Sequence, residues 1–151
     1  MTRTEPSLSA LYTDDETAWL EVMAERIGAG DYADLDYAHL REYLSDMARR
    51  DRREVKSRLT VLLTHVLKWA HQPGHRSRSW RSSIIEHRQE LAGLASHGVL
   101  RHHAEAVLGE AYSDAAERAA AETGLPADAF PAECEYTVDD LLAFEPINAD
   151  Q

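Results

Sequence analysis

The residues best suited to chemistry are polar side chains that fall on apolar helix faces. His65 lies within the apolar arc of a helix expected over residues 52–72, and Gln72 follows it on the same stripe. A buried polar group without a hydrogen bond costs about 1–3 kcal/mol. We therefore predict that His65 is mostly buried and hydrogen-bonded across helices. The candidate interior polar cluster comprises His65, Lys68, Gln72, Arg76, Arg88 and Glu122.

Two interpretations of this cluster remain open from the sequence. A structural network would fix the register of the helices, whereas an open pocket would bind an anion or another small ligand. Basic and hydroxyl side chains near a helix start suit a phosphate or carboxylate group. Serine is also a common N-cap, so the pattern alone does not decide. The anion-binding candidates are Arg76, Ser79 and Arg81.

The supply of metal ligands is poor. A single cysteine, Cys134, excludes a cysteine-based structural zinc site. His71 and His75 are separated by a Pro-Gly pair that breaks the helical geometry their spacing would need. We predict no dedicated metal site and no cofactor. The weak alternative is a site made by His65, His87 and Glu122.

Other catalytic patterns are missing from the sequence. It contains no GxSxG nucleophile elbow, no P-loop and no dinucleotide-binding glycine pattern. Cys134 lies in a proline-rich tail without an adjacent base, which disfavours a nucleophilic role. Whether the protein is an enzyme stays open, although the sequence favours a non-enzymatic protein.

The hydrophobic periodicity predicts helices that would position these side chains. Helices are expected from Thr13 to Gly28 or Gly30, from Asp36, over 52–72, from near Ser79, and over 99–123 with Gly124 as C-cap. The polar run 49–53 is either a turn or a solvated helical bridge. The expected fold is all-α, a single-domain bundle of about five helices over residues 1–151. Residues 1–12 form an N-terminal arm, and the proline-broken tail 125–151 packs on the bundle and carries a short helix capped by Thr137 with Asp140.

Charge is strongly uneven along the 151 residues. Acidic residues outnumber basic ones by 27 to 16, a net charge of −11, which disfavours general binding to nucleic acid or an anionic membrane. Residues 41–101 carry 13 basic and 6 acidic residues, whereas both flanking segments are acidic. We expect the basic middle segment to pair with the acidic ends. The alternative is a basic patch for an anionic partner, with segments 49–58 and 76–81 contacting nucleic acid.

No apolar run near the N-terminus resembles a signal peptide, and no stretch approaches 18 apolar residues. A cytoplasmic protein without a membrane partner is therefore expected.

Several residues, by their order and spacing, carry a resemblance to a known family. The most specific string is the HVLKWAHQP segment from His65 to Pro73, followed by Ser79-Trp80-Arg81 and Arg88. Further matches are Leu11-Tyr12, Trp19, Leu35-Asp36, Ala111-Tyr112, the ETGLP segment from Glu122, Phe130-Pro131 and Cys134. The chain resembles the bacterial DUF29 family of small, uncharacterised helical proteins over residues 10–145. The resemblance implies an all-α fold and no particular activity.

The function expected from the sequence is that of a non-enzymatic cytoplasmic helical module that mediates protein–protein interaction. One alternative is a small-ligand or anion-binding protein, or an enzyme, that uses a polar interior around His65, Lys68, Gln72 and Arg76. A second alternative is a nucleic-acid-associated factor. The oligomeric state stays open.

Overall fold

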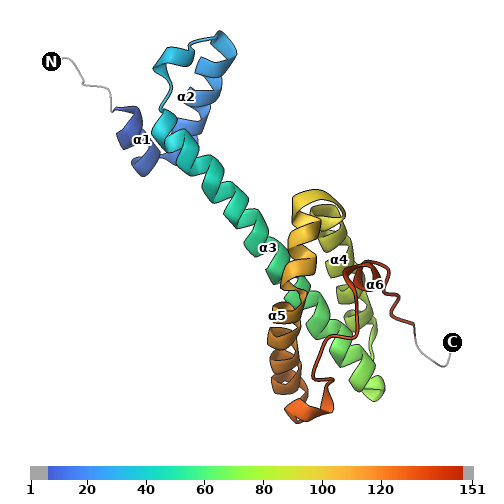
Figure 1. Ribbon diagram of the computed structural model, residues 1–151. Helices are drawn as coiled ribbons and strands as arrows, with labels where there is room; N and C mark the ends of the chain where they lie inside the picture. The colour runs from blue at the N-terminus through green and yellow to red at the C-terminus, as the bar shows by residue number, and fades with distance from the viewer. Residues whose placement is uncertain (1–6, 148–151) are drawn as a thin grey trace. The chain divides into compact units, whose positions relative to one another are not determined.

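Every regular element that the structure, a computed structural model, describes in residues 7–147 is helical (Figure 1). The expected all-α class is therefore confirmed. The α-helices are α1 (Leu8–Asp14), α2 (Glu16–Ala29), α3 (Tyr37–His71), α4 (Arg78–Ala95), α5 (Gly98–Thr123) and α6 (Val138–Leu142). Short 3-10 turns lie at η1 (Tyr32–Asp34), η2 (Pro73–His75) and η3 (Ala127–Ala129).

Helix α3 replaces two helices that the sequence analysis kept apart. It is 35 residues long, and the polar run 49–53 is an exposed part of it. Of the two interpretations of that run, the solvated helical bridge is the one observed. The physical reason is that no glycine or proline occurs between Gly30 and Pro73, so nothing local interrupts the backbone hydrogen bonds.

The N-terminal helices begin at other residues than expected. Helix α1 covers residues 8–14 and so includes part of the expected N-terminal arm. The Ser7 hydroxyl caps its first turn. Thr13 does not begin a helix, because it lies inside the last turn of α1. Asp15 takes the N-cap position of α2 instead and accepts a hydrogen bond from the backbone of Ala18 at 3.1 Å.

The other helix ends largely follow the predicted caps. Gly124 follows α5 with a φ of 75°, a conformation that glycine adopts without a steric penalty. Thr137 and Asp140 form the expected reciprocal capping box of α6. Helix α4 begins at Arg78, next to Ser79 as expected, and its N-cap is Ser77, whose hydroxyl accepts from the backbone of Trp80 at 3.1 Å.

The chain divides into two compact units, residues 1–49 and 50–151. Unit 1 contains α1, α2, η1 and the first part of α3, and Trp19 and Met23 are its buried apolar side chains. The indole of Trp19 donates to Asp36 at 3.2 Å and meets the ring of Tyr12 edge to face at 4.8 Å. A single aromatic side chain therefore joins α1, α2 and the start of α3.

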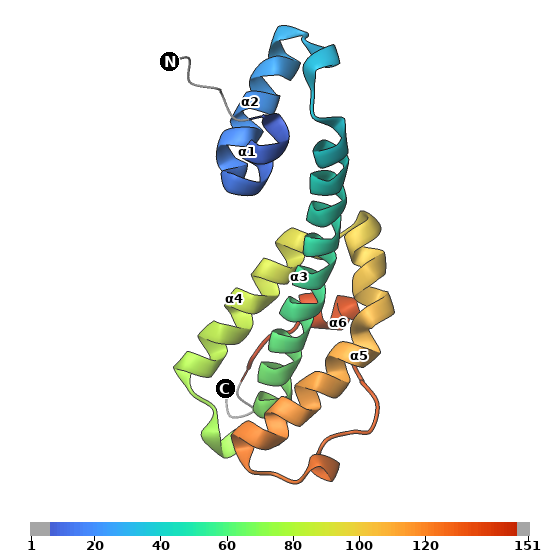
Figure 2. The same ribbon diagram turned by 90° about the vertical axis from the view of Figure 1, so that its left-hand side faces the viewer.

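Unit 2 holds the larger core. Helices α4 and α5 flank the second part of α3 (Figure 2), and apolar side chains of all three are fully buried. Phe130 and, from α6, Val138 and Leu141 complete the same cluster. The tail beyond Gly124 thus contributes to the hydrophobic core of this unit.

Two threonines on α3 lie on its buried face. Thr60 and Thr64 are only 2% and 5% exposed. Each hydroxyl donates to the backbone carbonyl four residues earlier, at 2.8 and 2.7 Å. This internal bond removes the cost of burying a hydroxyl group, so the buried face of α3 is wider than the apolar side chains alone indicate.

Among residues 7–147 there is no helix that is both long and apolar enough to cross a membrane.

Candidate functional site

The centre of the predicted polar cluster is a stacked pair of histidines. The rings of His65 on α3 and His87 on α4 lie 5.3 Å apart and within 14° of parallel. The Nδ1 atom of each ring is buried and makes no hydrogen bond. A carboxylate oxygen of Glu90 lies 3.4 Å from Nδ1 of His87, outside hydrogen-bond geometry. The prediction that His65 is hydrogen-bonded across helices is therefore wrong, because the side chain that stacks on it from α4 is another imidazole.

This environment favours the neutral form of His65. Burial is the largest cause that lowers the pKa of His65, and the neighbouring His87 and Lys68 lower it further. Glu122 acts in the opposite direction without reversing the shift. Protonation of His65 therefore opposes folding.

We expect the free energy of unfolding to fall as the pH drops below about 6.5, the ordinary pKa of histidine. The pKa of His65 is lowered in the folded state, so the unfolded chain binds a proton first as the pH falls. The stabilisation from neutral His65 is complete above that pH and is lost as the pH falls through its folded-state pKa. Replacing His65 with leucine should remove this part of the pH dependence, as measured by urea unfolding at a series of pH values.

The matched control is His102→Leu, because His102 lies exposed on α5. It should leave the pH dependence of unfolding unchanged. An H65L protein that loses stability on acidification as steeply as the wild type would contradict the assignment.

Lys68, Glu122 and Gln72 lie close together where α3 and α5 end. The ammonium group of Lys68 is 3.0 Å from the Glu122 carboxylate and 4.8 Å from the ring centre of Trp80. The Gln72 amide lies 3.5 Å from the backbone carbonyl of Thr123, the last residue of α5. These contacts satisfy the polar groups within the bundle, and they connect α3 to α4 and α5.

Arg76 and Arg88 bind partners outside this group. The guanidinium of Arg76 stacks 4.9 Å from the centre of the Trp69 ring and donates to the Trp69 carbonyl at 2.9 Å. Arg88 donates to the carbonyl of Phe144 and to the carboxylate of Glu145, both at 2.7 Å. The six predicted residues therefore do not form one network, because two of the arginines bind other segments of the chain.

The anion-binding candidates are likewise not brought together. Arg76 is engaged with Trp69, whereas Ser79 and Arg81 are exposed on the first turns of α4. A hollow of about 330 Å³ does lie on this helix. Its lining residues are Arg78, Arg81, Ser82 and Ile85.

Part of the basic middle segment pairs with the acidic C-terminal segment, as expected, but the expected pairing with acidic residues of the N-terminal segment is not among the ion pairs of residues 7–147. Lys56 lies 2.7 Å from Glu110 and 3.5 Å from Asp114. The guanidinium of Arg101 lies 2.7 Å from Asp139, at the start of α6. Each pair joins an exposed or half-exposed carboxylate, so each contributes about 0–1 kcal/mol and mainly specifies which surfaces meet.

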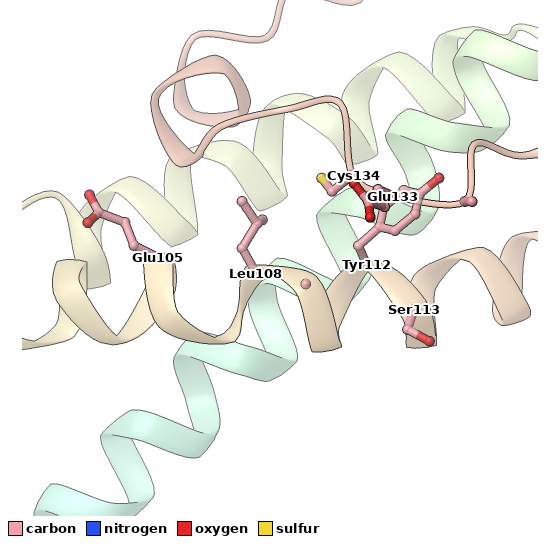
Figure 3. A pocket seen from close by; sticks show the side chains of 8 residues that line it. Glu105, Leu108, Tyr112, Ser113, Glu133 and Cys134 are labelled. Carbon is pink, nitrogen blue, oxygen red and sulfur yellow. The ribbon is translucent and has the colours of Figure 1, made fainter.

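A groove runs along α5 beside the C-terminal segment. One hollow of about 460 Å³ and another of about 390 Å³ share Glu105 and Leu108 in their linings. In Figure 3, Glu105, Leu108 and Tyr112 follow one another along α5, and Cys134 lies over Tyr112 on the crossing segment. Burial raises the pKa of the Cys134 thiol, which keeps it protonated and unsuited to nucleophilic attack.

No group of three histidine, cysteine or acidic side chains in a metal-binding arrangement occurs within the described residues. His65 and His87 stack on each other, and the carboxylate of Glu122 is bound to Lys68. The weak alternative of a metal site at these three residues therefore gains no support from the geometry.

The sequence analysis missed a surface at the junction of α2 and α3. Ile27, Tyr32 and Tyr37 are 44%, 59% and 57% exposed there, and Asp31 and Asp34 are exposed between them. We call these five residues the corner surface. The signal in the sequence is the DYADLDY segment from Asp31 to Tyr37, which contains three aspartates and two tyrosines.

The corner surface is held by its own hydrogen bonds. The hydroxyl of Tyr37 donates to the backbone carbonyl of Tyr32, and the guanidinium of Arg26 donates to the carbonyl of Asp34. Gly30, with a φ of 80°, reverses the chain after α2. The two tyrosines are therefore presented on a closed turn.

Comparisons with curated proteins and with solved structures found no match. A family model, by contrast, matches residues 11–145, nearly the whole chain. On that match, the chain belongs to DUF29, described as domain of unknown function DUF29.

Proposed function

We propose that the chain is a protein-interaction module of the bacterial cytoplasm, and that its corner surface binds a basic segment of a protein partner. The observation that carries the proposal is the distribution of exposed apolar side chains. Of the six large hydrophobic residues exposed in the described chain, four lie in the smaller unit 1. They are Ile27, Tyr32, Tyr37 and Leu44. Exposed apolar clusters on small domains are typical of interaction sites.

The chemistry of the corner surface supports a basic partner. Residues 7–49 carry ten acidic and three basic residues, a net charge of −7. Tyrosine rings attract lysine and arginine side chains through their faces, and neighbouring carboxylates bind the same cations. Tyr32 and Tyr37 alternate with Asp31 and Asp34 on the turn, which supplies both kinds of contact. Tyrosine is also among the residues that contribute most to protein interfaces.

The small-ligand alternative has less support. Four surface hollows of the described residues, among them those along α4 and α5, are lined by other side chains than His65, Lys68, Gln72 or Arg76. Lys68 is only 14% exposed and already bound to Glu122. The polar residues of the bundle are thus better explained as contacts between helices.

The proposal is tested by a photo-crosslinking residue placed at Tyr32 in the native host, with the same residue at Glu117 as control. Glu117 is exposed on α5, away from the corner surface in sequence. We expect one major protein adduct from position 32 and none of that protein from position 117. Binding of the two purified proteins should weaken about tenfold in Tyr37→Ala, as is typical of a central interface residue, and should weaken with added salt.

Two results would contradict the proposal. One is that position 32 yields no adduct beyond those obtained from position 117. The other is that the purified partner binds the Tyr37→Ala protein as tightly as the wild type.

A further inference from the structure

We infer that the corner surface binds the first turns of α4 in a second copy of this chain. This inference rests on the proposed function and names the partner. The surface in question consists of Arg78, Arg81, Ser82 and Ile85, which we call the α4 arginine face. These residues recur at spacings of three and four, so they lie on one side of α4, and they line the hollow of about 330 Å³.

Some basic side chains of unit 2 form ion pairs within the described residues, but the two arginines of this face do not. Lys56, Arg58 and Lys68 form ion pairs with acidic residues of α3, α4 or α5. Arg78 and Arg81 are exposed and have no ion-pair partner in residues 7–147. The α4 arginine face therefore presents two guanidinium groups that can bind an external acidic group.

The corner surface presents the complementary charges. Asp31 and Asp34 are exposed and, like the two arginines, form no ion pair within the described chain. Their spacings also agree. Three residues of a 3-10 turn rise about 6 Å, and three residues of an α-helix rise about 4.5 Å. Arginine side chains can span that small difference, so two arginine–aspartate pairs can form side by side.

The apolar parts of the two surfaces also suit each other. Arginine stacks on aromatic rings, so Tyr32 and Tyr37 can cover the guanidinium groups that the aspartates bind. Ile85 is a half-exposed apolar side chain one turn beyond Arg81, and Ile27 supplies an exposed apolar side chain at the corner. Each copy carries both surfaces, so copies of this chain can bind one another through two equivalent contacts.

The test is sedimentation of the full chain from micromolar to sub-millimolar concentration, at low and at high salt. We expect concentration-dependent association that salt weakens. Arg81→Glu and Asp34→Arg should each lower the association constant at least about tenfold, because each places like charges opposite one another. The matched control is Arg118→Glu, which reverses an exposed arginine on α5 and should associate as the wild type does.

A mixture of the two single variants separates contact between copies from any other effect of the charges. In the mixture, the arginine introduced at position 34 of one variant faces the glutamate introduced at position 81 of the other. The second contact keeps its native Asp34 and Arg81. The mixture should therefore associate although neither variant does so alone.

Failure of the second-copy inference can be distinguished from failure of the proposed function. A wild-type chain that stays monomeric, an R118E effect equal to that of R81E, or a mixture that stays monomeric would each overturn the second-copy inference. If the crosslink from Tyr32 then joins a different protein, the proposed function still stands. Self-association that ignores both Asp34→Arg and Tyr37→Ala would contradict the corner surface as the site that binds the second copy.

Discussion

Replacing Trp19 with alanine should unfold unit 1 while unit 2 stays folded. Trp19 is fully buried, and Met23 is the only other large apolar side chain buried in the described part of that unit. The substitution removes the ring contact with Tyr12 at 4.8 Å and the hydrogen bond to Asp36 at 3.2 Å. Truncation of a buried tryptophan costs about 3–5 kcal/mol, which is a large share of the stability of so small a unit.

The loss of the indole also affects Asp36 directly. Burial raises the pKa of this carboxyl, but hydrogen bonds from His39 and Trp19 more than offset the effect and leave the pKa below its ordinary value. Without Trp19, the carboxylate loses one of its hydrogen-bond donors. The change therefore weakens the start of α3 in addition to the core of unit 1.

Amide hydrogen exchange measured by NMR resolves the two units separately. Protection should disappear in α2 of the Trp19→Ala protein and persist in α4 and α5. Tyr32→Ala, which truncates an aromatic ring that is 59% exposed, should leave α2 protected. Slow exchange in α2 of the W19A protein would show that Trp19 is not what holds unit 1 together.

Replacing Leu141 with alanine should lower the free energy of unfolding of unit 2 by about 2–5 kcal/mol, the range for a buried leucine that leaves a cavity. Leu141 is fully buried although its helix, α6, has only five residues. It belongs to the same core cluster as Leu63 of α3 and Leu91 of α4. The measurement is chemical denaturation followed by far-ultraviolet circular dichroism.

Leu44→Ala provides a matched control, because it makes the same chemical change at a leucine that is 60% exposed. It should leave the unfolding of unit 2 unchanged. If L141A unfolds at the same denaturant concentration as L44A, the C-terminal segment does not contribute to the stability of the core.

The sequence by itself determined the all-α fold class and most helix ends, because both depend on short-range features of the chain. Pro73 stops α3 because it lacks an amide hydrogen, and Gly124 ends α5 because it accepts a positive φ. The Thr137–Asp140 capping box is a contact between residues three apart, so the sequence alone predicts it. These signals depend on residues within one or two helical turns of each other.

The tertiary structure alone decided which groups meet. The helical wheel placed His65 on a buried face, but only the packing of α4 showed that an imidazole faces it and that both Nδ1 atoms lack a partner. Arg88 binds Phe144 and Glu145, which lie 56 and 57 residues away along the chain, and no periodic pattern encodes that contact. The exposure of Tyr32 and Tyr37 was equally hidden, because an aromatic residue is buried or exposed according to what packs on it. Periodicity identifies the side of a helix that avoids water, whereas the partner on that side depends on how separate helices pack.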